Sequence, residues 1–282
     1  MAITAAAVKE LRQKTGAGMM DCKRALQEAN GDMEEAVKIL RTKGLAAAAK
    51  KAHRAASEGI VAIAGGGAEA AMIELNCETD FVARNETFQE FARNLVEQVL
   101  ADGVDELDAF KARPYAKDAE HTVEQAISQA IATIGENIVL SRIAYWKAAD
   151  GNAIASYVHM GGKIGVLVEG SGSIPETALR DVAMHIAATD PRFLSRDEVT
   201  EAILDNEREI ALKQAMDQGK PEHIAQRIVQ GKMEKFFEQV VLLEQPFAKD
   251  PSMSVGEYVQ KNGGEGAAIA RFLRFKLGEA GQ

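Results

Sequence analysis

The side chains in this sequence that could act as nucleophile, general base or metal ligand are two cysteines and five histidines. Cys22 and Cys77 fall in different predicted modules without CxxC or Cys/His ligand spacing, which predicts buried free thiols in a reducing compartment. The histidines lie in separate predicted elements and have no Cys, Asp or second His at a metal-ligand offset: His53, His121, His159, His185 and His223. We therefore expect no metal site and no cofactor.

Sequence signatures of enzymes are also scarce. The chain has no GxxxxGKS/T, HExxH or GxSxG motif and no GxGxxG between a strand and a helix. An enzyme would need a nucleophile such as Cys77 to find its base in the folded chain. His185 lies on the apolar face of residues 183–188 and is expected in the core. His159 lies where a strand meets a Gly turn, so its ring is expected to be exposed.

The most informative segment is LNCETDFVARN at residues 75–85, where an apolar strand runs into polar residues and then into Asp80 and Phe81. Turn chemistry favours Gly, Asn and Pro rather than a large ring. In one interpretation Phe81 and Val82 fold back over the sheet edge while Asp80 caps the next helix. In the other, Phe81 is exposed and contacts a second protein. The residue types alone leave both open.

Composition describes an ordinary soluble chain. Its 282 residues are 46% hydrophobic and carry a net charge of −9, enough apolar material for two or more modules. The negative charge disfavours direct nucleic-acid binding, and no apolar stretch approaches the ~18 residues of a membrane span. A cytoplasmic location is expected. The charge is uneven, because residues 1–54 hold 11 Lys and Arg against six Asp and Glu. An acidic partner would be attracted to this end.

The elements that position these residues indicate an α+β protein. Residues 1–44 show three short amphipathic helices, which predicts a compact ubiquitin-associated-like module, and the Ala/Lys-rich stretch 45–57 is typical of a loosely held helical linker. Residues 58–150 show a β-hairpin, helices and a third strand. The same order returns in 151–194 and 246–282, which predicts a duplicated core of antiparallel sheets with helices on one face.

An insertion separates the parts of the second repeat. Residues 195–245 show a capping-box pattern at Ser195 to Glu198, two segments of helical period and a break at Gly219-Lys220-Pro221. Its apolar stripe is too narrow for burial on all sides. This predicts a projecting antiparallel helical hairpin of coiled-coil type.

Several segments together resemble one family. Residues 15–26 (TGAGMMDCKRAL) and 79–85 (TDFVARN), in this order and at this distance, closely resemble bacterial translation elongation factor Ts. The resemblance spans nearly the whole chain. It continues at 135–138 (GENI), 156–168 (SYVHMGGKIGVLV), 183–194 (AMHIAATDPRFL) and 245–247 (QPF).

The resemblance implies a guanine-nucleotide exchange factor that acts on the GTPase elongation factor Tu and catalyses no covalent step. Four residues would press between GTPase helices near its magnesium and phosphate site: Thr79, Asp80, Phe81 and Val82. Three residues of the N-terminal module would contact the GTPase or else form the module's core: Leu11, Met19 and Met20. Further contacts are implied for Ile134, Gly135, His159, Met160 and Gly161.

An alternative class accounts for most of the same architecture. A non-catalytic adaptor could combine the ubiquitin-associated-like head with a helical hairpin that pairs with its copy in a homodimer. This interpretation leaves Asp80 and Phe81 without a role.

Overall fold

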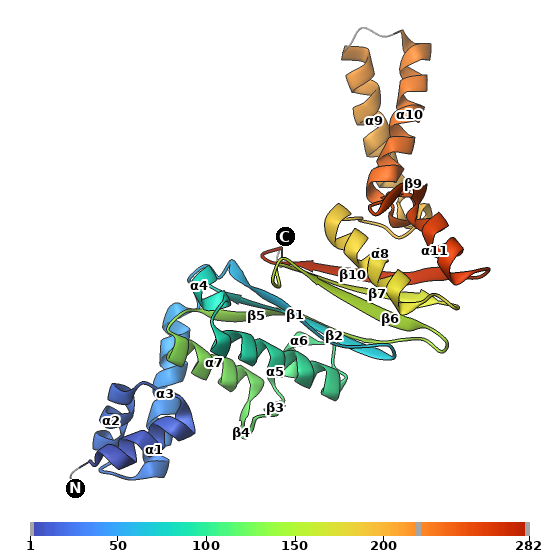
Figure 1. Cartoon of the computed structure of the whole chain (residues 1–282). Coiled ribbons are helices and arrows are strands. Elements are labelled where there is room, and N and C mark those ends of the chain that lie inside the picture. Colours follow the sequence, from blue (N-terminus) through green and yellow to red (C-terminus); the bar gives the residue numbers. More distant parts are fainter. Residues whose placement is uncertain (1–2, 218–220, 280–282) are drawn as a thin grey trace.

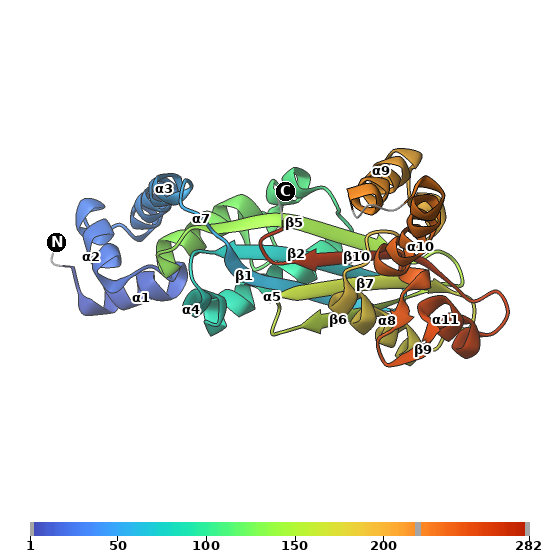
Figure 2. The same ribbon diagram turned by 90° about the horizontal axis from the view of Figure 1, so that it is seen from above.

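The computed structural model describes residues 3–217 and 221–279, and it confirms the α+β class. Figure 1 shows three parts: a group of N-terminal helices, a core of two sheets and a projecting pair of helices. Figure 2 shows the N-terminal helices and the projecting pair at opposite ends of the core. None of the helices in the described ranges combines the length and apolar character needed to cross a membrane.

The N-terminal module consists of α1 (Ala5–Thr15), α2 (Met19–Glu28) and α3 (Met33–Lys51). Thr4 and Asp32 cap α1 and α3 by accepting hydrogen bonds from backbone N–H groups. The helix α3 continues to Lys51, so the start of the predicted linker at residue 45 falls inside it. The Ala-rich sequence favours helix, and this second half of α3 packs on the core helix α7 (Val123–Ile134).

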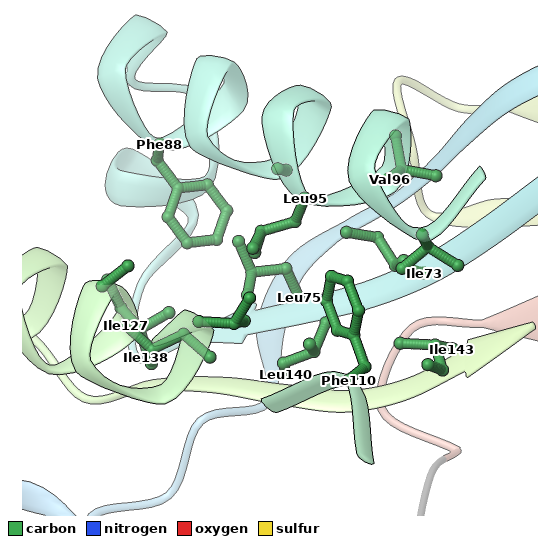
Figure 3. Packing of buried hydrophobic residues seen from close by; sticks show 14 of the residues in the cluster. Ile73, Leu75, Phe88, Leu95, Val96, Phe110, Ile127, Ile138, Leu140 and Ile143 are labelled. Atoms are coloured by element: carbon green, nitrogen blue, oxygen red, sulfur yellow. The ribbon is translucent and has the colours of Figure 1, made fainter. Parts of the chain in front are cut away.

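The first sheet contains β1 (Glu58–Gly66), β2 (Glu69–Cys77) and β5 (Ile138–Lys147), all antiparallel and in the order β1-β2-β5. Helices α5 (Glu86–Asp102) and α7 cover its outer face. Figure 3 shows the resulting core, in which Phe88 and Leu95 of α5 point toward Leu75 of β2 and Leu140 of β5. All four side chains are buried.

The second sheet repeats this plan. It contains β6 (Ala153–His159), β7 (Ile164–Ser171) and β10 (Ala268–Lys276) in the order β10-β7-β6, and helices α8 (Glu176–Thr189) and α11 (Val255–Gly263) cover it. The two sheets lie face to face with the helices outside (Figure 1). Apolar residues from both sheets, including Met72, Leu167 and Phe275, fill the space between them.

The duplication includes two small hairpins that the sequence did not predict. They are β3 (Pro114–Tyr115) with β4 (Asp118–Thr122), which follows the short α6 (Leu107–Lys111), and β8 (Pro246–Phe247) with β9 (Asp250–Ser254). Each hairpin runs directly into a helix that starts with a capping box, from Thr122 in α7 and Ser254 in α11.

One polar side chain from the long helix of each repeat holds the hairpin in place. Gln98 Oε1 in α5 accepts a hydrogen bond from Ala116 N at 2.9 Å, and His185 Nδ1 in α8 accepts one from Ala248 N at 3.1 Å. The bond fixes the tautomer, because Nδ1 then carries no proton and Nε2 donates to Gln245 Oε1 at 2.8 Å. His185 is therefore the predicted core histidine, held by one side chain and one backbone group.

Two arginines join the sheets in a reciprocal manner. In the first sheet Arg142 Nε donates to the buried Glu74 carboxylate at 2.7 Å, and in the second Arg271 Nε donates to the buried Glu169 carboxylate at 2.7 Å. Each guanidinium also crosses to the other sheet, since Arg142 stacks on the Phe275 ring at 4.0 Å and Arg271 stacks on the Trp146 ring at 4.1 Å. Breaking one such pair leaves a buried charge, which typically costs about 3–5 kcal/mol.

The insertion forms α9 (Glu201–Asp217) and α10 (Glu222–Val240), which project from the core (Figure 1). The predicted capping box at Ser195 is wrong, because residues Arg196–Glu198 form a short 3₁₀ helix without a side-chain cap and α9 starts later. The Glu198 carboxylate instead accepts a bond from Leu194 N. Of the predicted break, Gly219 and Lys220 lie outside the described residues, and Pro221 precedes α10.

The base of the projecting pair is held by Arg196, which joins the 3₁₀ turn to α10 and to a second 3₁₀ helix, Leu242–Glu244. Its guanidinium donates to Glu234 and Glu244 and lies over the Phe237 ring at 4.1 Å.

We expect the stability of the second repeat to depend on pH through His185. Burial, only partly offset by the hydrogen bond to Gln245, holds the pKa of His185 below its ordinary value. The unfolded chain therefore binds the proton more readily. The free energy of unfolding has its full value above about pH 7 and falls as pH drops below about 6.5, by at most ~1.4 kcal/mol per pH unit for one proton.

The variant His185→Gln tests this, because Gln98 shows that a glutamine can make the same bond. Urea unfolding between about pH 7 and pH 5.5 should show a shallower fall in the free energy of unfolding than the parent chain shows. The variant His53→Gln, at an exposed position, is the control for replacing a surface histidine, and the change of slope in His185→Gln is compared with it. An identical slope in the parent and in His185→Gln would contradict the assignment.

Candidate functional site

The TDFV segment, Thr79 to Val82, is separated from the end of β2 by Glu78 alone and begins the one-turn helix α4 (Asp80–Ala83). Thr79 is the N-cap, and its hydroxyl accepts a hydrogen bond from Val82 N at 3.4 Å. Successive residues of a helical turn point in different directions, and here only one side of the turn faces the core. Phe81 is 83% exposed, whereas Val82 packs against the first core and Ala83 is buried.

This geometry decides between the two interpretations of the segment. Phe81 does not fold back over the sheet edge, although Val82 does. The expectation that Asp80 caps the helix is wrong, since Thr79 has that position and the Asp80 carboxylate pairs with Arg84 Nη2 at 3.0 Å. The pair is exposed, and such pairs contribute about 0–1 kcal/mol. Asp80 and Arg84 therefore flank the exposed ring with charge and do little to hold the helix.

The side chain that holds the TDFV segment comes from a distant part of the chain. Glu136 follows α7, which ends at Gly135 in the left-handed conformation. The Glu136 carboxylate accepts hydrogen bonds from Glu78 N at 3.1 Å, Thr79 N at 3.0 Å and Thr79 Oγ1 at 2.7 Å. Hydrogen bonds to a charged acceptor contribute about 1.5–3 kcal/mol each. The backbone that carries Phe81 is thus fixed to the start of β5.

Glu78, whose N–H donates to Glu136, also accepts a hydrogen bond from the residue that follows Glu136. Its Oε1 accepts from Asn137 N at 2.7 Å and from Arg54 Nη1 at 3.3 Å, and Asn137 Nδ2 donates to Arg54 O at 2.8 Å. The Asn137 N–H, partly opposed by burial and assisted by Arg54, lowers the pKa of Glu78. We call Arg54, Glu78, Thr79, Glu136 and Asn137 the Glu136 network. It joins the segment after α3 to the TDFV segment and to β5.

Cys77 lies beneath this network and is not a nucleophile. Its Sγ is buried and donates to Thr79 O at 3.2 Å. Burial, with a further contribution from the negative charge of Glu136, raises the pKa of Cys77 to about 12. The residue is therefore a protonated thiol at neutral pH, and the thiolate is the reactive form of cysteine.

Of the other predicted contact residues, two lie beside the network. Ile134 is half-buried against the first core, and Gly135 is exposed with φ at 93°. The chain continues from Gly135 into Glu136, so these residues and the TDFV segment meet at one end of the core. Glu136 and Asn137 belong to the matching motif GENI, but no local sequence pattern identifies them as the residues that hold Thr79.

The turn between β6 and β7 lies at the same end of the core. In this turn, Gly162 O accepts a hydrogen bond from Val61 N at 2.7 Å. Val61 belongs to β1, whose first residues pair with the last residues of β2. Met160 is 66% exposed and Gly161 is exposed beside it. His159 is half-buried rather than fully exposed, because its Nδ1 is 3.0 Å from the Tyr157 hydroxyl.

In the N-terminal module the structure separates the three predicted contact residues. Met19 and Met20, at the start of α2, are 54% and 62% exposed. Leu11 is fully buried between the helices with Cys22 and Leu26. The expectation that Leu11 contacts a partner directly is therefore corrected, since its side chain is part of the module core.

An exposed aromatic ring on a turn held by hydrogen bonds, with exposed methionines on the N-terminal module and on the β6–β7 turn, is the kind of surface that protein-recognition sites present. The described residues contain no group of three or more His, Cys, Asp and Glu side chains placed to hold a metal ion. The family model described as Elongation factor TS matches residues 78–279, and the chain belongs to this family. The family consists of nucleotide exchange factors for elongation factor Tu, which act in translation elongation.

We predict that Glu136→Ala loosens the TDFV segment without unfolding the core. The variant removes the acceptor of three hydrogen bonds at a part-buried site, where water can replace part of the lost interaction, so the free energy of unfolding should fall by about 2–4 kcal/mol, less than the sum of the three bonds. Native-state hydrogen exchange at the Glu78 and Thr79 amides should become at least tenfold faster beyond the change that the lower global stability causes at the central β2 amide of Ile73.

The exposed Glu97→Ala, in α5, is the matched control and should change neither quantity. Unchanged exchange at Thr79 in Glu136→Ala would show that the segment is held by other contacts.

Proposed function

We propose that this chain speeds GDP release from elongation factor Tu by pressing Phe81 between helices of the GTPase near its Mg²⁺ and phosphate site. The supporting observation is the exposure of Phe81 on a turn whose backbone is fixed by the Glu136 network. A fixed ring can displace a partner's helix, whereas a ring on a mobile loop would move aside. The family membership supplies the partner.

The energetics require more than this one ring. To weaken nucleotide binding, the factor must bind the nucleotide-free GTPase more tightly than the loaded form, and the two effects are equal by linkage. A ~10⁴-fold shift needs about 5.5 kcal/mol of differential binding, whereas burying one Phe side chain yields about 1.5–3 kcal/mol. Further contacts must therefore contribute.

Two exposed surfaces suit these contacts. Met19 and Met20 offer unbranched, polarisable side chains from the N-terminal module, and Gly135 lies where α7 meets the Glu136 network. The β6–β7 turn with Met160 offers a second apolar contact from the other repeat. Contact at several points would give the leverage that Phe81 needs to move a helix.

The chemical consequence follows from the coordination of Mg²⁺. This ion demands near-octahedral geometry and bridges protein groups to phosphate oxygens. A displaced helix disturbs that shell, so the diphosphate loses its counter-charge. Asp80 does not capture the ion in this account, since one carboxylate is a poor Mg²⁺ site and this one pairs with Arg84.

Self-association through the projecting hairpin stays a prediction. Ile210 and Met216 of α9 are 43% and 56% exposed, which would suit pairing with a second copy.

We expect Phe81→Ala to lower the rate of GDP release about 10- to 100-fold at equal factor concentration, as the loss of one buried Phe predicts. The measurement is release of fluorescent GDP from elongation factor Tu. Because Phe81 is exposed in the free chain, its removal should change the free energy of unfolding by less than about 0.5 kcal/mol.

The control is Val139→Ala, which trims an exposed apolar residue of β5. An unchanged rate with Phe81→Ala, or an equal loss with Val139→Ala, would overturn the proposal.

A further inference from the structure

The two surfaces proposed to contact the GTPase lie on different parts of the chain. Met20 belongs to the N-terminal module and Phe81 to the core, and α3 is the element that joins the two parts. Ala36, in the first half of α3, lies in the module core, whereas Ala48, in the second half, packs against the first core. The helix has 19 residues and is therefore about 28 Å long. A change in its tilt on the core would move Met20 relative to Phe81.

Apolar packing alone holds α3 weakly on the core. Of the described residues 43–51 in its second half, Gly44 alone is buried. A Cβ added at Gly44 would be 3.7 Å from Ala132 Cβ of α7, so the two helices meet through small residues. Such residues bury little apolar area and provide no bulky ridge to fix the angle at which the helices cross. The orientation of α3 therefore depends on other interactions.

Two polar side chains tie the end of α3 to the core. Lys51 Nζ donates to Ile131 O at 3.3 Å, in the last turn of α7, where a cation interacts favourably with the helix dipole. Asn137 Nδ2 donates to Arg54 O at 2.8 Å, just beyond the end of α3. Because Asn137 is 3% exposed, water does not readily replace this bond. Its own N–H is part of the Glu136 network, so one residue joins α3 to the TDFV segment.

We infer that Lys51 and Asn137 are positioning residues for nucleotide exchange, an inference that rests on the proposed function. They fix the tilt of α3, so that Met19 and Met20 keep one orientation relative to Phe81. A GTPase then meets both surfaces in one encounter, because contact with the first raises the effective concentration of the second. A module that moved freely would have to be ordered on binding, which costs affinity. In this role neither positioning side chain contacts the GTPase.

The first test measures the orientation of the module in the free chain. Nitroxide labels would be attached to cysteines introduced by Gln27→Cys in α2 and Glu97→Cys in α5, both exposed positions. The native Cys22 and Cys77 are buried and should stay unlabelled. Pulsed electron spin resonance should give one narrow distribution of label-to-label distances for the parent chain.

Two independent variants should broaden this distribution at least about twofold. Lys51→Met keeps the apolar stem and removes the ammonium group, and Asn137→Ala removes the amide but keeps the backbone N–H that donates to Glu78. The matched control is Lys50→Met, an exposed neighbour on α3, which should leave the distribution narrow.

The second test is GDP release from elongation factor Tu at increasing concentrations of the GTPase. Lys51→Met and Asn137→Ala should raise KM at least about threefold and leave kcat within about twofold, since they add only the cost of ordering the module. Lys51→Arg keeps a cation at the end of α7 and should restore the parent KM. Hydrogen exchange at the Thr79 amide should be as slow in Lys51→Met as in the parent chain, unlike in Glu136→Ala.

Narrow distributions in both variants, or a broadened distribution with an unchanged KM, would overturn the inference. A failure of the proposed function would be recognised differently, because Phe81→Ala would then release GDP as fast as the parent chain. The distance measurement contains no GTPase, so it reports on the two ties whatever the outcome of the exchange assay.

Discussion

The position of Phe81 depends on one carboxylate. Glu136 accepts three hydrogen bonds from Glu78 and Thr79, and it lies in the short connection between the Gly135 cap of α7 and the start of β5 at Ile138. The strand β2, the helix α7 and the strand β5 thus meet at one point. In the free chain an exposed aromatic side chain makes no packing contacts that hold it in place. Hydrogen bonds from the surrounding fold must therefore fix the backbone that carries it.

The structure that supports the Glu136 network is a duplicated unit. Two copies of a sheet with outer helices are joined by the reciprocal pairs of Glu74 with Arg142 and of Glu169 with Arg271, whose guanidinium groups stack on rings of the opposite sheet. Each repeat also uses one polar side chain to hold its small hairpin. The β6–β7 turn of the second repeat consequently lies at the same end of the core as the TDFV segment, which allows both repeats to face one partner.

Much of this arrangement could be predicted from sequence because its signals are local. Alternating apolar residues and Gly turns predicted the long strands, and an aromatic residue after a strand end drew attention to Phe81. The strands β3 and β8 have two residues each, too few to show a period. The bonds of Glu136 to Glu78 and Thr79 span 58 and 57 residues respectively, and no local pattern reports such a contact. The capping box predicted at Ser195 shows that a sequence motif can match although its acidic residue, Glu198, accepts a hydrogen bond from a different backbone N–H, that of Leu194.

The central claim is that Phe81 acts through the Mg²⁺ site of the GTPase, and the most direct test compares GDP release with and without that ion. The parent chain and Phe81→Ala would be assayed on elongation factor Tu in millimolar Mg²⁺ and again after chelation. The account predicts that the ratio of the two rates is large in Mg²⁺ and falls to about one once the ion is removed. A ratio that stays the same under both conditions would contradict it.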